Sequence, residues 1–423
     1  MKIFKGVTSH YGVICILTLT TIEGINVSML SPLFPLSAKR KLVSTAWIGL
    51  ISGVADVTAL LSAFLLPLIL RPENLELCYT VGACSSGLLL LTFGCIVQIW
   101  NSDLLIILCF INRALAGVAA ALLYTCAFPV ATGLIPSKMG LIISIMQSNI
   151  GIGITAGPPI GSYLFELGGI MLPFTIIGLA ECLCSFVLPC FVSSKDPSIE
   201  KKELISAFSK SLFMRYILQP ATLAFSMPYF CVMIFSGLRD VSISLFLFTE
   251  FQLDEKSNFL VFFIYGLSQI FFSPLIGMFV DKGFSGAIYF VGIITSAIAM
   301  IGILCLKLPL LHSTASIYVL MALNSFSCVS LNITSYIILS KEAEKLNCES
   351  KSMTKFMASS WMSCMRSFGS LNLKELACDY MLKQLATSVT NIHGIMTDLI
   401  LTRGDEDIVD NVLVDDSYEC FPI

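Results

Sequence analysis

The chain has 423 residues, of which 56% are hydrophobic and 13% are charged, and its mean hydropathy is +0.87. A soluble domain carries about a quarter charged residues, so this composition excludes an ordinary soluble protein and predicts a protein embedded in membrane lipid. The net charge of −3, without a long basic run, excludes nucleic acid as a partner.

Ten stretches are apolar and long enough to cross a bilayer, because about 20 helical residues cover a hydrocarbon core of roughly 30 Å. The predicted spans are 11–34, 47–70, 79–100, 104–128, 141–166, 170–192, 219–249, 258–280, 286–307 and 315–340. We therefore expect an all-α, multi-pass membrane protein.

Charge and polarity divide the chain into four parts. Residues 1–192 hold six spans, 193–215 form a polar linker, and 216–371 form an incomplete second bundle. Within that bundle, 356–371 is predicted not to span, because it is short and contains an arginine. Residues 372–423 are predicted to be degenerate last spans and an acidic tail.

Basic residues gather on one side of the predicted spans. The other side holds Lys39, Arg40, Lys41, Lys256 and Lys307. The positive-inside rule then predicts that both termini and the linker are cytosolic. The basic cluster in the first non-cytosolic loop runs against this rule.

Glu23 interrupts the first span near its middle, where a charged group is costly and marks a functional site by default. Asn26 follows one turn later, and Gln147 lies in the fifth span. Each is predicted either to hydrogen-bond a substrate or to satisfy a helix contact. Acids outnumber bases inside the spans, which favours a cationic substrate. The acids are Glu23, Asp56, Glu181 and Asp240, and the bases are Arg113 and Arg239.

Asp56 and Arg113 lie at similar depths in neighbouring spans. An arginine keeps its charge at any working pH, so it needs a partner inside a membrane. The predicted pair is either an electrostatic element of a proton route or an ion pair that fixes two helices. For Glu181, a transport role and a helix-packing hydrogen bond both remain open.

The fifth span carries a run of small residues with Gly153, Gly157, Pro158 and Gly161. Glycines four apart permit close approach of helix backbones, and a proline removes one amide donor and bends a helix. The run predicts a hinge or a tight helix contact, with an ordinary packing face as the alternative.

The eighth span ends with Gly277 and Asp281. A carboxylate at this place can meet a helix terminus or a cation and so latch one gating state. The corresponding segment of the first half, 66–73, lacks the glycines and the acid.

The layout of six spans, a charged linker and further spans resembles the major facilitator superfamily, which has twelve spans in two pseudo-symmetric halves. Residues 151–161 resemble its antiporter motif, 113–121 its arginine motif and 266–283 its loop motif. Within the superfamily, the chain resembles the vesicular amine transporters, especially the polyamine branch. The segments that carry this resemblance are 28–35, 47–53 and 239–250.

This resemblance implies proton-coupled antiport of polyamines or monoamines by alternating access. Glu23 and Asp240 would bind the amine, and Glu23, Asp56, Arg113 and Asp240 would couple it to protons. The implied setting is an acidic intracellular vesicle, and the expected form is a monomer without a cofactor or metal.

Two alternatives stay open. A drug-type or organic-anion facilitator would share the fold, and the missing eleventh-span motif is also compatible with a transport-inactive, truncated isoform. An enzyme is not expected, since zinc-spaced histidines, phosphate loops and Gly-x-Ser-x-Gly are absent from the sequence.

Overall fold

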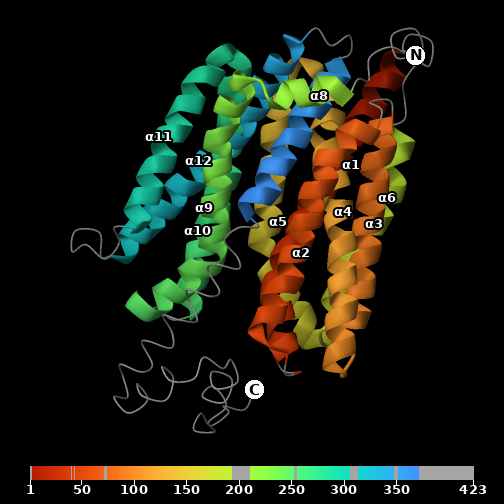
Figure 1. Cartoon of the computed structure of the whole chain (residues 1–423), viewed down its shortest axis with the longest axis vertical. Helices are drawn as coiled ribbons and strands as arrows, with labels where there is room; N and C mark the ends of the chain where they lie inside the picture. The colour runs from red at the N-terminus through yellow and green to blue at the C-terminus, as the bar shows by residue number, and fades with distance from the viewer. Residues whose placement is uncertain are drawn as a thin grey trace.

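The computed structural model describes residues 2–39, 41, 43–70, 74–192, 210–251, 255–304, 313–346 and 351–370. The described residues contain helices and no strand, which confirms the all-α prediction (Figure 1). Each of the ten predicted spans coincides with a long helix. These helices are α1 (Lys2–Lys39), α2 (Thr45–Ile69), α3 (Leu75–Ile96), α4 (Ser102–Leu134), α5 (Met139–Gly168), α6 (Met171–Val192), α9 (Pro220–Phe251), α10 (Glu255–Phe279), α11 (Ser285–Leu304) and α12 (Thr314–Glu344).

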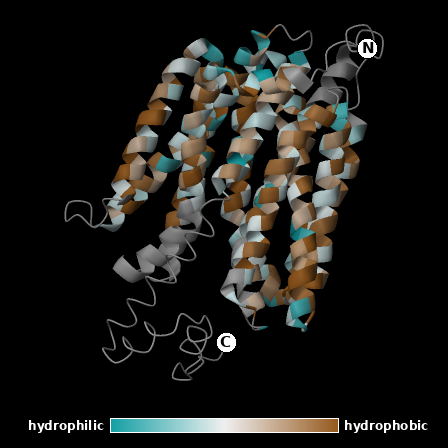
Figure 2. Ribbon diagram, in the orientation of Figure 1, coloured by the Kyte–Doolittle hydropathy of each residue, from teal (hydrophilic) through white to brown (hydrophobic). Residues whose placement is uncertain are grey.

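Apolar side chains cover the outside of the helix bundle. Nine stretches of the described residues are long and apolar enough to cross a membrane, one of which, Phe263–Ile303, covers most of α10 and of α11. Large hydrophobic side chains are exposed along them, including Leu61, Leu183, Phe186, Phe271 and Phe290. Figure 2 shows hydrophobic colours along the helices and hydrophilic colours gathered at one end. Such a surface is stable against lipid, and the protein is therefore multi-pass.

The helices form two groups. In the first, α1 packs on α5, α3 packs on α6, and α4 packs on both α2 and α3. In the second, α12 contacts α9, α10 and α11. Helices α5 and α10 pack against each other and join the two groups.

A further helix covers 351–370, which includes most of the segment 356–371 that was predicted not to span. It is about 30 Å long at roughly 1.5 Å per residue, and it lies in the middle of the molecule, blue in Figure 1. Most of its side chains are buried, including those of Phe356, Ser360 and Cys364. It is not among the nine stretches that are apolar enough to cross a membrane, because it contacts protein on most sides and needs no continuous apolar face toward lipid.

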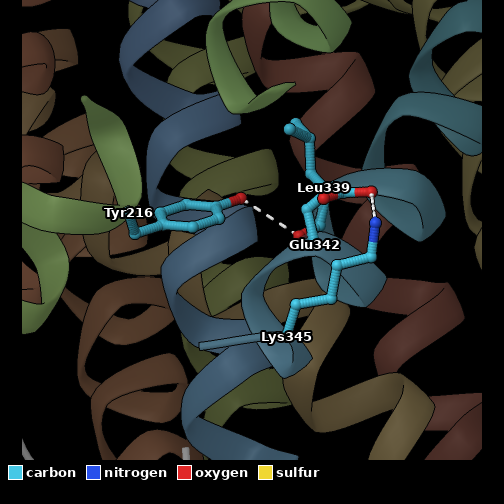
Figure 3. A network of polar contacts seen from close by, with 4 residues as sticks. All are labelled: Tyr216, Leu339, Glu342 and Lys345. Carbon is cyan, nitrogen blue, oxygen red and sulfur yellow. Dashed lines mark hydrogen bonds and ion pairs between the residues drawn. The ribbon is translucent and has the colours of Figure 1, made fainter. Parts of the chain in front are cut away.

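The short helix α8 (Lys210–Ile217) marks one end of the bundle, called here the α8 end (Figure 1). There the buried Tyr216 hydroxyl donates to the Leu339 carbonyl at 3.2 Å, and Lys345 Nζ lies 2.5 Å from Glu342 Oε1 (Figure 3). The Tyr216 hydrogen bond ties α8 to the last turns of α12, and the Lys345–Glu342 pair is local to the end of α12. The rest of the predicted linker, 193–209, lies outside the described residues.

Lys41 gives a local explanation for the basic loop that opposes the charge rule. Its ammonium group donates to the Val97 carbonyl and, at 2.7 Å, to the Ile99 carbonyl, just after α3 ends. Partial burial lowers the pKa of this ammonium. A cation is favoured beside the carbonyls that end a helix, so this lysine serves the fold at the end opposite α8.

Candidate functional site

A small cavity lies between the two helix groups, near the middle of the bundle. Its volume is about 40 Å³, roughly the room that three water molecules need. Its polar and aromatic lining comes from Thr20, Glu23, Tyr124, Phe128, Gln147, Tyr229, Asn332, Ser359, Ser363 and Arg366. Both halves therefore contribute groups that can bind a polar molecule.

Glu23 on α1 supplies the acidic group of this cavity. The residue is 4% exposed, and its Oε1 accepts a hydrogen bond from the Tyr124 hydroxyl at 3.2 Å. The Arg366 guanidinium lies over the face of the Tyr124 ring, 4.0 Å from its centroid. Tyr124 thus contacts both an acid of the first half and a base of the second.

Behind Glu23, away from the cavity lining, lies a second acid. The Glu181 carboxyl on α6 is within hydrogen-bonding range of the Glu23 carboxyl. Asn26 Nδ2 donates to Glu181 Oε2 at 3.3 Å and to Ser86 Oγ at 3.5 Å. Asn26, predicted as a substrate ligand or a helix contact, makes helix contacts here.

The other predicted substrate ligands differ in their placement. Gln147 lines the cavity, and its Oε1 accepts from Gln269 Nε2 at 3.5 Å, across the two halves. Asp240 belongs to α9, but its side chain lies outside the part of the chain that the structure describes.

Arg113 has an aromatic neighbour that its depth did not predict. Its guanidinium lies over the Phe93 ring, 4.3 Å from the centroid. Stacking on an aromatic face stabilises a buried guanidinium, because the ring presents negative charge to it. The pairing of Arg113 with Asp56 stays a prediction.

The motif glycines of α5 face α1, inside the first half. A Cβ atom added to Gly157 would overlap Ser28 Oγ, one added to Gly153 would overlap α1 backbone atoms, and one added to Gly161 would lie 2.5 Å from Met29 Cγ. Helix α5 continues through Pro158 to Gly168. The structure shows a tight helix contact at these glycines, and their role as a gating hinge stays a prediction.

A different row of small residues joins α5 to α10. A Cβ atom on Gly277 would overlap Ser144 Oγ, and one on Gly266 would overlap Thr155 Oγ1. Between them, Ser148 Oγ donates to the Ile270 carbonyl at 2.8 Å. The close contact between the two halves therefore involves Gly277, which was predicted, and Gly266, which was not.

Asp281 closes this contact at the α8 end. Its Oδ1 accepts from the Gly140 amide at 2.7 Å and its Oδ2 from the Leu141 amide at 2.9 Å, at the start of α5. The turn after it needs Gly283, whose φ of 98° suits glycine. Asp281 lies at the end of α10 and binds a helix N-terminus of the other half, which is one of its two predicted partners.

Sequence reasoning missed Tyr124, Tyr229, Asn332 and Arg366 as members of the cavity lining. A signal existed for Arg366, which is a charged residue in an otherwise apolar and small-residue run. The tyrosines gave no signal, because an aromatic residue within an apolar helix is ordinary.

The family follows from a match along most of the sequence. The family model of the Major Facilitator Superfamily matches residues 16–371. The chain belongs to this superfamily. The members of this superfamily are membrane transporters and not enzymes, which agrees with the class of protein predicted from the sequence.

Named relatives are similar over shorter stretches. The chain is 26% identical to the human MFS-type transporter SLC18B1 over 259 residues, which are 60% of this chain and 54% of the relative. It is 25% identical to the rat protein of the same name over 327 residues, or 76% of this chain and 68% of the relative. The chain thus spans about half the length of the human relative. These matches support the resemblance noted from the sequence.

Two solved structures share the fold. The human organic anion transporter MFSD10 (TETRAN) matches with a TM-score of 0.59 and 16% identity, covering 87% of this chain and 93% of that protein. A bacterial homologue of the iron transporter ferroportin, in an outward-facing state, matches with a TM-score of 0.61 and 13% identity, covering 87% and 91%. At such identities the likeness concerns the fold alone.

Proposed function

We propose that this protein is a proton-coupled antiporter of organic cations, with polyamines or monoamines as substrates, working by alternating access. The observation that carries the proposal is the Glu23 carboxyl, buried in mid-span and lining the cavity between the halves. A carboxylate there can pair with an ammonium group in a low-dielectric site, or accept a proton in its place.

Aromatic rings around the acid support a cationic substrate. Tyr124, Phe128 and Tyr229 all line the cavity, and an ammonium group over an aromatic face gains about 0.5–2 kcal/mol. Asn332 and Gln147 add hydrogen-bonding groups. The substrate is then held by one charge, several rings and a few amides.

Alternating access is supported by where the halves are joined. Lys355 Nζ donates to the Thr132 carbonyl at 3.3 Å, and Asp281 binds the start of α5, both toward the α8 end. The cavity of about 40 Å³ is too small for an amine substrate, so the halves must separate on one side to load it. We assign the α8 end to the cytosol from the charge distribution, so that an acidic vesicle interior supplies the exchanged protons.

Arg366 favours a second candidate function, organic-anion transport. Its guanidinium lines the same cavity and stacks on Tyr124, and a guanidinium binds carboxylate or phosphate groups well. One of the structural neighbours is named an organic anion transporter. Glu23 and Arg366 therefore point to opposite substrate charges.

Uptake by the purified chain in proteoliposomes with an imposed pH gradient separates the two candidates. The substrates to compare are spermidine, serotonin and an organic anion. For the cation function, Glu23→Gln lowers amine uptake roughly 30- to 700-fold, since losing a buried charge partner costs about 2–4 kcal/mol. Glu166→Gln, an exposed change on α5, is the matched control.

Arg366→Gln tests the alternative. If anions are the substrates, this change abolishes anion uptake, and amines are not transported by the unchanged protein. Amine uptake that survives Glu23→Gln at the wild-type rate would refute the proposed function.

A further inference from the structure

The Glu23 and Glu181 carboxyls form a buried pair with an incomplete set of hydrogen bonds. Each has one oxygen with a donor: Glu23 Oε1 accepts from Tyr124 and Glu181 Oε2 accepts from Asn26. The other two oxygens, Glu23 Oε2 and Glu181 Oε1, are buried and have no donor among the described residues.

A single proton resolves this arrangement. Two ionised carboxylates in contact inside a low-dielectric protein repel each other, whereas one proton between them gives a strong hydrogen bond. A protonated carboxyl carries one O–H donor and keeps an acceptor oxygen. If Glu181 Oε1 holds the proton and donates it to Glu23 Oε2, both unpartnered oxygens are satisfied.

The surroundings indicate which member keeps the proton. Glu181 is 0% exposed and does not line the cavity, whereas Glu23 does. Arg366 lines the same cavity as Glu23, so a positive charge is available there to the carboxylate of Glu23, whereas Glu181 lies outside this lining. No ion pair to either acid exists within the described ranges.

Tyr79 on α3 is a further buried polar residue close to the two carboxyls. Its hydroxyl is fully buried, lacks a hydrogen-bond partner in the described part of the chain, and lies near both acids. Ser86, also on α3, contacts Asn26. The groups that face the pair are therefore Asn26, Tyr79, Ser86, Tyr124, Arg113 and Arg366.

We propose that Glu181 is a positioning residue that stays protonated during transport and donates a hydrogen bond to the Glu23 carboxylate. The pair then presents one negative charge to the cavity, on Glu23, and Glu23 alone exchanges the substrate ammonium for a proton. The transport role of the pair rests on the proposed function, but its protonation does not.

Infrared spectroscopy of the purified full chain tests the protonation directly. At neutral pH, the wild-type protein is expected to show the carbonyl band of a buried carboxylic acid. Glu181→Gln removes this band, and Glu23→Gln leaves it. A wild-type spectrum without the band would overturn the proposal, as would a band that is lost in Glu23→Gln and kept in Glu181→Gln.

Transport by two Glu181 variants tests the positioning role. Glutamine at 181 reproduces the donor and acceptor of a protonated acid, so Glu181→Gln keeps amine uptake within about threefold of wild type. Glu181→Ala leaves Glu23 Oε2 without its donor and lowers uptake about 5- to 100-fold. Thermal melting of each variant, with Glu166→Gln beside them, separates loss of fold from loss of function.

The outcomes distinguish this proposal from the proposed function. If the wild-type protein moves no amine, the proposed function fails, while the infrared bands still decide whether Glu181 is protonated. If Glu181→Gln abolishes uptake as completely as Glu23→Gln without a change in melting, Glu181 exchanges protons itself and the positioning role is wrong.

Discussion

Replacing Asp281 by asparagine should weaken the closure of the α8 end. Asp281 makes two short hydrogen bonds, of 2.7 and 2.9 Å, to the first amides of α5 in the other half. Asparagine keeps one acceptor oxygen but loses the second bond and the charge. One hydrogen bond at an exposed site contributes about 0.5–1.5 kcal/mol, and a charge at a helix N-terminus about 0.3–1 kcal/mol. The sum of about 1–2 kcal/mol shifts the open-to-closed ratio roughly 5- to 30-fold.

Distances between spin labels can measure this shift. Ser137 and Ala287 are exposed, lie at the α8 end, and belong to different halves. Cysteines at these two positions, in a background without other reactive cysteines, would carry the labels. Asp281→Asn should increase the ratio of the long-distance to the short-distance population by the factor given above for the open-to-closed ratio.

Asp103→Asn provides the matched control. Asp103 is another acid in the first turn of a helix, α4, but α4 starts at the end opposite α8. Asp103→Asn should leave the distribution of label distances unchanged. If Asp281→Asn also leaves this distribution unchanged, the contact of Asp281 with α5 contributes nothing to closure, and its predicted role as a latch is wrong.

Three further changes test other parts of the structure. Gly266→Leu should separate the halves and slow transport, because Gly266 packs against the other half. Gly157→Leu should instead lower thermal stability, because Gly157 packs against α1 within the same half. If both variants change melting and uptake equally, this difference between the two glycines is wrong. Tyr216→Phe should lower the free energy of unfolding by about 1 kcal/mol, since it removes the hydrogen bond to the Leu339 carbonyl. Tyr163→Phe, at an exposed position, should leave the free energy of unfolding unchanged, and melting curves in detergent compare the two variants. An epitope inserted at 193–209 should be cleaved by protease added to the cytosolic face of sealed vesicles, and protection from that protease would reverse the assigned orientation.

The helical fold could be predicted because length and apolarity are properties of each segment alone. The ten spans needed no information about partners, and the family match agrees with the superfamily inferred from them. The 351–370 helix escaped prediction for the opposite reason. Its stability depends on neighbours that accept serine, cysteine and arginine side chains, and no local pattern records those neighbours.

The sequence predicts the first acid of the candidate site, Glu23, but predicts less well which residues contact one another there. Glu23 stands out because a carboxyl in an apolar run is costly wherever it points. Arg113 was assigned to Asp56 by depth, but depth says nothing of the direction around a helix, and the sequence did not predict that its guanidinium lies on Phe93. The contact of Glu181 with Glu23 depends on how α1 and α6 are rotated against each other.

The polar character of the 351–370 helix has a consequence for how the protein is made. A segment with an arginine near the bilayer centre is opposed by about 2.5–3.5 kcal/mol when it enters the membrane on its own. Arg366 is accommodated by the Tyr124 ring of α4, which is synthesised long before it. We therefore expect this helix to insert late and only into an assembled bundle, so that α4 acts as its folding template in the membrane.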